Sequence, residues 1–242
     1  MTKLVLDIGN SFQKAAIFSN NDMVYFESAE NIYVSLESLF CKFHPASAII
    51  ASVVEKNKAL INLLNSKCPT LICNGQIPTP LTNKYLTPET LGGDRLAAAV
   101  AGNQMFPAKN LLVVDAGTCI KYDFVRADAT YLGGSIAPGI QMRFNALHTF
   151  TGKLPLVERT ENTPLTGKNT TQSILSGVLN GTVAEVDGII YKYNEQYSDI
   201  KVVLTGGDAD YLAGKLKSKI FAIPNMVLIG LKIILDYNDK EK

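Results

Sequence analysis

Two short stretches of this sequence place a carboxylate, a glycine and a hydroxyl group at the end of an apolar run. The first is LVLDIGNS, residues 4–11, and the second is LLVVDAGT, residues 111–118. Asp7 and Asp115 follow runs that are expected to form buried strands, and ligands of α/β sheets bind at this end of a strand. A carboxylate beside a flexible glycine and a hydroxyl donor suits a phosphate with a metal ion, although a plain Asx turn has the same composition.

The two stretches belong to a longer internal repeat. LVLDIGNSFQKAAIF (4–18) and LLVVDAGTCIKYDFV (111–125) each contain an apolar strand, Asp-x-Gly, a hydroxyl residue and a second β-rich run. Their acids lie 115 − 7 = 108 residues apart, which is close to half of the 242 residues. This self-similarity predicts two related lobes, residues 1–110 and 111–242, with a nucleotide cleft between them. Chance is the alternative, because Asp-x-Gly ends many strands.

Three glycine-rich stretches carry further candidate site residues. In TLGGDRLAAAVAG (90–102), Asp94 is either an N-cap or a carboxylate that accepts a proton from a substrate hydroxyl, with Arg95 holding an anion. YLGGSIAPGIQMRF (131–144) is either a turn or the wall of a substrate pocket. VVLTGGDADYL (202–212) is a strand that ends in a glycine pair, which suits a turn or a ligand lying against the backbone. Each motif alone leaves both interpretations open.

The elements that must position these residues alternate between strands and helices. Strands are expected at 47–54, 70–74 and 201–207, helices at 60–68, 94–106, 170–197 and 227–237, and a loop rich in Pro and Thr at 75–94. This alternation predicts the α/β class.

The long helix expected to open near Asn169 or Thr170 has an apolar face. That face carries Ile174, Val178, Ile189 and Ile190. We expect it to pack against the same helix of a second copy in a two-fold dimer. The alternative is that the helix is buried within its own lobe and that Thr170 is an N-cap.

Composition limits the classes of function. The 23 basic and 22 acidic residues give a net charge of +1, which predicts neither a nucleic-acid surface nor a polybasic membrane patch. No apolar run is long enough to span a bilayer, and no leader pattern opens the chain. Four cysteines without C-x-x-C spacing and only two histidines argue against a zinc site and a disulfide scaffold. The four thiols are therefore predicted to be buried, in a reducing cytoplasm.

Taken in order, the motifs resemble those of type III pantothenate kinases, within the superfamily of actin, sugar kinases and heat-shock ATPases. The resemblance runs nearly from one end of the chain to the other. The matching segments are Asp7-Ile8-Gly9-Asn10-Ser11 with Lys14, Gly92-Gly93-Asp94-Arg95, Asp115-Ala116-Gly117-Thr118, Gly133 to Gly139, and Thr205-Gly206-Gly207. The resemblance implies an α/β fold of two actin-like, ribonuclease H-like lobes. It implies ATP-dependent phosphorylation of pantothenate to 4′-phosphopantothenate, the first step of coenzyme A biosynthesis. It also implies a cytoplasmic homodimer that uses Mg²⁺ and either K⁺ or NH₄⁺, with no nucleic acid or membrane as partner.

The resemblance further implies roles for individual residues. Asp94 is expected to be the catalytic base, and Asp115 is expected to bind the monovalent cation. The residues implied in ATP binding are Asp7, Ile8, Gly9, Asn10, Ser11, Phe12, Gln13, Lys14 and Thr118, with Asp7 holding Mg²⁺ directly or through water. The residues implied in pantothenate binding are Tyr85, Gly92, Gly93, Asp94, Arg95 and, from the other chain of the dimer, Thr170.

The chain departs from the family pattern after its second Asp-x-Gly. Cys119, Ile120 and Lys121 stand where smaller or hydroxyl residues are frequent, and Lys121 is expected to alter the affinity for the nucleotide or the cation. Ser11 also replaces a frequent Thr but keeps the hydroxyl. Two alternatives to the pantothenate kinase remain, a kinase of a sugar or other small alcohol and a non-catalytic actin-like ATP-binding regulator. The intact Gly-Gly-Asp-Arg motif argues against the regulator.

Overall fold

The computed structural model describes residues 1–52 and 58–240, and its contacts divide the chain into two compact units. The first unit comprises Met1–Pro107, Asp128–Leu132 and Asn225–Lys242, and the second comprises Ala108–Ala127 and Gly133–Pro224. This division differs from a single cut between residues 110 and 111, because the C-terminal helix packs within the first unit. The last two residues of the strand expected at 47–54 lie outside the described residues.

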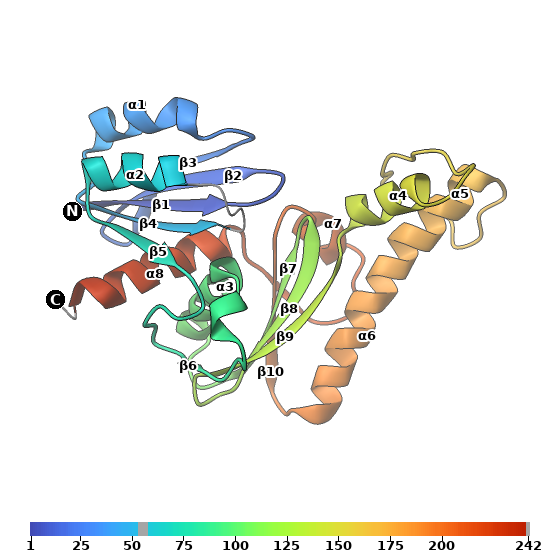
Figure 1. Ribbon diagram of the computed structural model, residues 1–242. Coiled ribbons are helices and arrows are strands. Elements are labelled where there is room, and N and C mark those ends of the chain that lie inside the picture. Colours follow the sequence, from blue (N-terminus) through green and yellow to red (C-terminus); the bar gives the residue numbers. More distant parts are fainter. Residues whose placement is uncertain (53–57, 241–242) are drawn as a thin grey trace. The chain divides into compact units, whose positions relative to one another are not determined.

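The first unit is a five-stranded sheet with two helices on each face (Figure 1). In sheet order its strands are β3 (Asp22–Ala29), β2 (Gln13–Ser19), β1 (Thr2–Ile8), β4 (Ser47–Ser52) and β5 (Thr70–Cys73). The helices are α1 (Tyr33–Phe43) and α2 (Lys58–Lys67) on one face, and α3 (Gly93–Met105) and α8 (Met226–Lys240) on the other. Strands β1, β4 and β5 run parallel, so their carboxyl ends share one edge of the sheet.

The expected 75–94 loop contains two short elements. These are β6 (Thr82–Asn83) and a 3₁₀ turn (Pro88–Thr90). Strand β6 pairs in parallel with Thr130 and Tyr131, which open β9 (Thr130–Pro138) and belong to the first unit. This pairing anchors the loop two residues before Tyr85.

Helix α3 is buried along nearly its whole length, which explains its alanine-rich sequence. Residues 93–102 of this helix are all buried. At Gly230 of α8 an added Cβ would lie 1.8 Å from the carbonyl oxygen of Ala97, so the two helix backbones approach closely at that point. Small residues on both helices are therefore needed for this packing.

The second unit repeats the topology of the first. In sheet order its strands are β9, β8 (Cys119–Val125), β7 (Asn110–Ala116), β10 (Ile200–Thr205) and β11 (Phe221–Ala222). The first hairpin is antiparallel, and the strand on the other side of β7 is parallel, as in the first unit. Strands β1 and β7 begin and end 108 residues apart, so the repeat seen in the sequence is a repeat of structure.

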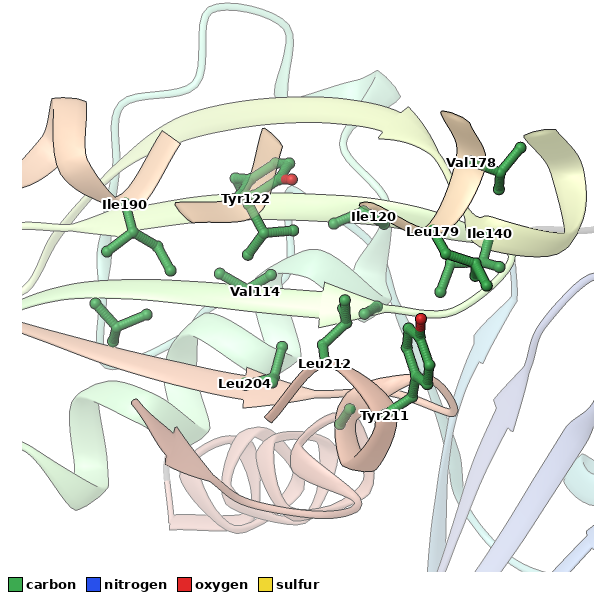
Figure 2. Close-up of a cluster of buried hydrophobic side chains, with 14 of the residues drawn as sticks. Val114, Ile120, Tyr122, Ile140, Val178, Leu179, Ile190, Leu204, Tyr211 and Leu212 are labelled. Carbon is green, nitrogen blue, oxygen red and sulfur yellow. The ribbon is translucent and has the colours of Figure 1, made fainter. Parts of the chain in front are cut away.

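The long helix of the second unit packs into its own core. It comprises α5 (Thr170–Leu175), a π-helical segment (Ser176–Asn180) and α6 (Gly181–Gln196), and the unit is completed by α4 (Ile140–Thr149) and α7 (Ala209–Ala213). Figure 2 shows Val178 and Ile190 in the cluster that also holds Val114 and Leu204. Ile174, Val178 and Ile190 are at most 6% exposed, and Ile189 packs against the same cluster. The prediction that this face meets a second copy is therefore wrong, because the sheet of the same unit covers it.

All four cysteines are free. Cys68 and Cys73 are buried, Cys119 is half-buried and Cys41 is exposed. The prediction of four buried thiols is therefore wrong for Cys41. Among residues 1–52 and 58–240, no helix is both long enough and apolar enough to cross a membrane.

Candidate active site

The turn between β1 and β2 presents a short exposed loop behind a carboxylate. Asp7 is the last residue but one of β1 and lies opposite Lys14 in the antiparallel register. The Gly9 N–H donates to the Phe12 carbonyl oxygen at 3.2 Å, and a Cβ on Gly9 would lie 2.8 Å from that oxygen. Asn10, between these two residues, is exposed, as is the rest of the tip. A tight turn with an exposed tip after an acid has the form of a phosphate-binding turn.

Two of the residues implied in ATP binding have side chains that are used elsewhere. Ile8 is 1% exposed and belongs to the hydrophobic core of the first unit. The Gln13 Oε1 accepts a hydrogen bond from the Ile32 N–H at 3.0 Å, which fastens the start of α1 to β2. Ile8 can therefore offer a ligand only its backbone atoms, and the Oε1 of Gln13 is already occupied, whereas Phe12 is 56% exposed.

Helix α3 begins at the predicted base. Gly92 is its N-cap, with an extended backbone and no capping side chain, so the alternative in which Asp94 is the N-cap is wrong. Asp94 lies in the first turn, where the positive end of the helix dipole favours a carboxylate. Asp94 is 8% exposed and Arg95 is 6% exposed, which is unusual for charged side chains. A Cβ on Gly92 would lie only 2.4 Å from Asp94 Oδ1, so this glycine makes room for the carboxylate.

Arg95 connects the helix start to the loop that precedes it. Its guanidinium carbon lies 5.5 Å from the centroid of the Tyr85 ring, a cation–π distance. The Tyr85 ring in turn lies 6.3 Å from the ring of Tyr131, and the Tyr85 N–H donates to Asn83 Oδ1 at 2.9 Å. The structure thus brings Tyr85 and the Gly-Gly-Asp-Arg motif together, as the resemblance implies for a substrate site.

Cys73 lies within electrostatic range of two acids that are far apart in the sequence. Burial, together with smaller effects from the charges of Asp94 and Asp7, raises the pKa of its thiol to about 12. Both carboxylates therefore act on one thiol at the carboxyl edge of the sheet, where β1 and β5 end. From the sequence, Cys73 was expected only to be a buried packing residue. Its position at the end of a strand parallel to β1 was the available signal.

The two glycines before Asp94 give a prediction that separates function from stability. Gly92→Ala keeps an allowed backbone conformation but pushes against Asp94 Oδ1, so we expect kcat to fall by at least about tenfold with little loss of stability. Gly93→Ala would place its Cβ 2.2 Å from the Cys73 carbonyl oxygen, and we expect it to lower the free energy of unfolding by about 1–3 kcal/mol. Steady-state kinetics and urea denaturation of both variants provide the measurement. If Gly92→Ala and Gly93→Ala lost the same free energy of unfolding, Gly92 would be needed for packing and not to leave room for the Asp94 carboxylate.

In the second unit, two glycine-rich loops clamp the turn after β7. A Cβ on Gly139 would lie 2.1 Å from the Gly117 carbonyl oxygen, and the Gly139 N–H donates to the Thr118 carbonyl oxygen at 3.1 Å. Gly206 has a φ of +98°, and a Cβ there would lie 2.2 Å from the Ala116 carbonyl oxygen. Three motifs that are separate in the sequence therefore meet at the turn that carries Thr118.

Asp115 is paired with a lysine. Lys121 lies opposite Asp115 in the β7–β8 register, and its Nζ lies 2.8 Å from Asp115 Oδ2. The two side chains are 19% and 16% exposed, so the pair is partly shielded from water. The carboxylate that was expected to bind a monovalent cation thus already has a cationic neighbour within the chain.

Thr170 is exposed at the first position of α5. The cap of that helix is Asn169, whose side chain accepts from the Gln172 N–H at 2.9 Å, so the alternative that makes Thr170 the N-cap is wrong. Thr170 belongs to the second unit, and Tyr85 and Asp94 belong to the first.

Two repeated lobes, each opened by an acid-bearing hairpin, define the class of actin-like ATPases and sugar kinases. Similar structures have been solved for a Campylobacter jejuni protein named as a Baf family transcriptional activator (TM-score 0.62, 22% identity, 98% of this chain and 99% of that one). Others are the polyphosphate/ATP-glucomannokinase of Arthrobacter sp. strain KM (0.54, 12%, 98% and 99%) and MreB 5 of Spiroplasma citri bound to AMPPNP (0.55, 11%, 99% and 97%). At these identities the likeness shows the fold.

Within that class, the chain belongs to the type III pantothenate kinase family. The model of that family matches residues 3–192. The type III pantothenate kinase of Bacteroides fragilis strain ATCC 25285 is 44% identical over 239 residues, which covers 98% of both chains. That of Christiangramia forsetii is 40% identical over 244 residues, covering 97% of this chain and 98% of the relative. The chain is therefore a kinase with ATP as its co-substrate.

Proposed function

We propose that this chain transfers the terminal phosphoryl group of ATP to the primary hydroxyl of pantothenate, forming 4′-phosphopantothenate for coenzyme A biosynthesis. The observation that carries the proposal is the buried Asp94 at the start of α3, beside an Arg95 whose guanidinium lies at cation–π distance from the Tyr85 ring. Membership of the type III pantothenate kinase family supports the same activity. The reaction belongs in the cytoplasm, where ATP is available.

Asp94 orients the substrate hydroxyl and accepts its proton as the oxygen attacks phosphorus. Its low exposure keeps water away from that proton transfer, and Gly92 leaves the carboxylate oxygen free to approach the substrate. Arg95 supplies a positive charge for the carboxylate of pantothenate, and its cation–π contact with the Tyr85 ring helps to hold the guanidinium in place. Positioning and charge neutralisation provide most of the catalysis of phosphoryl transfer.

Each unit presents an acid-bearing turn whose groups suit nucleotide phosphates. In the first unit the exposed tip from Asn10 to Phe12 offers backbone N–H groups, and Lys14 offers a positive charge. In the second unit the clamped turn offers Thr118. Rigid turns suit this role because their N–H groups need no rearrangement as charge develops.

Mg²⁺ fits the acid at the end of β1. Among residues 1–52 and 58–240, no three His, Cys, Asp or Glu side chains gather into a metal-binding group. Mg²⁺ does not need one, because it is usually held by one or two carboxylates, substrate phosphates and water. Asp7, half-buried beside the phosphate-binding turn, would hold it there, and the ion would offset the negative charge of the transferred group.

A coupled kinase assay with pantothenate and a panel of sugars and other small alcohols tests the proposed substrate. We expect turnover with pantothenate and none above background with the sugars, because Arg95 has no anionic partner on a neutral sugar. Each substrate should be supplied with ATP and Mg²⁺, and pantothenol, the neutral alcohol analogue of pantothenate, is the matched control. A faster rate with any sugar than with pantothenate would contradict the proposal.

We also propose a homodimer in which Thr170 of one chain completes the pantothenate site of the other. The resemblance and the exposure of Thr170 support this proposal, whereas the apolar face of the long helix no longer does. Mixing two inactive variants, Asp94→Asn and Thr170→Trp, is expected to restore activity. In a mixed dimer, one of the two sites has native Asp94 from one chain and native Thr170 from the other. Random pairing makes half of the dimers mixed, so about a quarter of all sites are restored.

The complementation needs evidence that subunits exchange. The variants are unfolded and refolded together, one of them carrying an affinity tag, and co-purification of the untagged chain reports mixed dimers. Refolding each variant alone is the control and should leave it inactive. A mixture that exchanges subunits but stays inactive would show that each site is built within one chain.

A further inference from the structure

Lys121 is a charged residue beside the predicted cation site, and the proposed function gives this lysine no role. Its ammonium group lies 2.8 Å from Asp115 Oδ2. The resemblance expects free K⁺ or NH₄⁺ at that carboxylate. An alkylammonium ion has the same charge as NH₄⁺ and also donates hydrogen bonds to oxygen. A free cation that binds Asp115 Oδ2 would have to share this oxygen with the Lys121 ammonium group or displace that group.

We infer that the Lys121 ammonium replaces the free monovalent cation, so that this kinase works without K⁺ or NH₄⁺. The inference rests on the proposed function, because it concerns the same site. It changes one expected property of that site: Asp115 becomes the anchor of a built-in cation, and Lys121 becomes the residue that positions positive charge at the clamped turn.

The fold holds Lys121 in this place. Asp115 and Lys121 are partners in the β7–β8 register, so their side chains leave the hairpin as neighbours. The turn between these strands is clamped by Gly139 and Gly206, which fixes the end of the hairpin. A tethered ammonium has a local concentration that does not vary with the salt in solution. The partial burial of the pair also reduces screening by dissolved ions.

The structural repeat supports a functional role for the pair. In the first unit Asp7 lies opposite Lys14 at the same point of the first hairpin, and the proposed function assigns Lys14 to the nucleotide phosphates and Asp7 to Mg²⁺. The second hairpin places Lys121 at the corresponding point opposite Asp115. Each lobe therefore presents an acid and a lysine together at the end of its first hairpin.

The test compares rates in KCl, NH₄Cl and NaCl at matched ionic strength. For the native enzyme we expect kcat/KM for ATP to agree within twofold in the three salts. Lys121→Met keeps the length of the side chain and removes its charge. For this variant we expect at least a tenfold lower kcat/KM in NaCl, with at least fivefold recovery in KCl or NH₄Cl. Lys201→Met is the matched control, because Lys201 pairs with Asp199 at 3.0 Å in the same unit but away from the turn, and its rates should match the native ones.

Thermal unfolding gives a readout that does not depend on catalysis. The Tm of Lys121→Met should be higher in KCl than in NaCl, because K⁺ then occupies the place of the lost ammonium at the Asp115 carboxylate, whereas the native Tm should be equal in both salts. A native enzyme that loses most of its activity in NaCl would overturn the inference, and so would a folded Lys121→Met variant that responds to no salt. If Lys121→Met does not fold, the native comparison decides. If neither the native enzyme nor either variant phosphorylates pantothenate in any of the three salts, the proposed function fails. The Tm comparison then still decides the role of Lys121.

Discussion

Asp94→Asn is expected to lower kcat for pantothenate phosphorylation by about 10²–10⁴-fold, the usual contribution of a general base. The amide keeps the size and shape of the carboxylate but cannot accept the hydroxyl proton. Asp94 is nearly buried and Gly92 leaves space against its Oδ1, so the variant should keep the native arrangement. Steady-state kinetics with saturating ATP and pantothenate provide the measurement, with circular dichroism to confirm folding.

A purely structural role for Asp94 predicts a different result. A carboxylate in the first turn of a helix contributes about 0.3–1 kcal/mol through the helix dipole, so its loss would lower stability slightly and leave kcat unchanged. Asp210→Asn is a suitable control, because Asp210 is also an acid in the first turn of a helix, α7, but is exposed. If Asp94→Asn retained more than half of the native kcat, Asp94 would not be the base.

Gly206→Ala is expected to have the largest effect on stability among single methyl additions at the clamped turn. A φ of +98° is unfavourable for alanine, and the new Cβ would lie 2.2 Å from the Ala116 carbonyl oxygen. We expect the free energy of unfolding to fall by about 2–6 kcal/mol, since a strained backbone and an overpacked site each cost roughly 1–3 kcal/mol. Urea denaturation followed by circular dichroism measures the change.

The neighbouring glycine provides the control for this prediction. A Cβ on Gly207 would have no atom within 4 Å, so Gly207→Ala should change the free energy of unfolding by less than about 1 kcal/mol. A soluble Gly206→Ala variant with native stability would contradict the clamp. If both variants lost stability equally, the loop would be sensitive to any added methyl group rather than to the contact with Ala116.

The sequence predicted the parts of the site that depend on local order. An apolar run followed by Asp-x-Gly specifies a strand and its turn within a few residues, so the hairpins around Asp7 and Asp115 could be predicted. That Asp94 and Asp7 both act on Cys73 could not be derived from spacing, because it depends on β5 lying parallel to β4 in the sheet. The resemblance supplied that connection instead.

Contacts between distant segments explain the incorrect predictions. The apolar face of residues 170–196 indicates that something covers the helix, but periodicity cannot say whether this is the same chain or another. Likewise, an apolar helix at the end of the chain gives no sign that it packs against α3. Lys121 was recognised as an unusual residue, yet its pairing with Asp115 required the strand register.

The first unit is assembled from both ends of the chain, and this has a consequence for synthesis. Helix α8 contributes Leu228, Leu231 and Ile234 to the packed interior of that unit, and all three have no exposed surface. Domains usually fold in the order in which the ribosome makes them. Here residues 108–224 contain a whole unit before α8 has been translated, so the lobe that starts first must finish last. A released chain that ends just before α8 would therefore contain a folded second lobe and an incomplete first one.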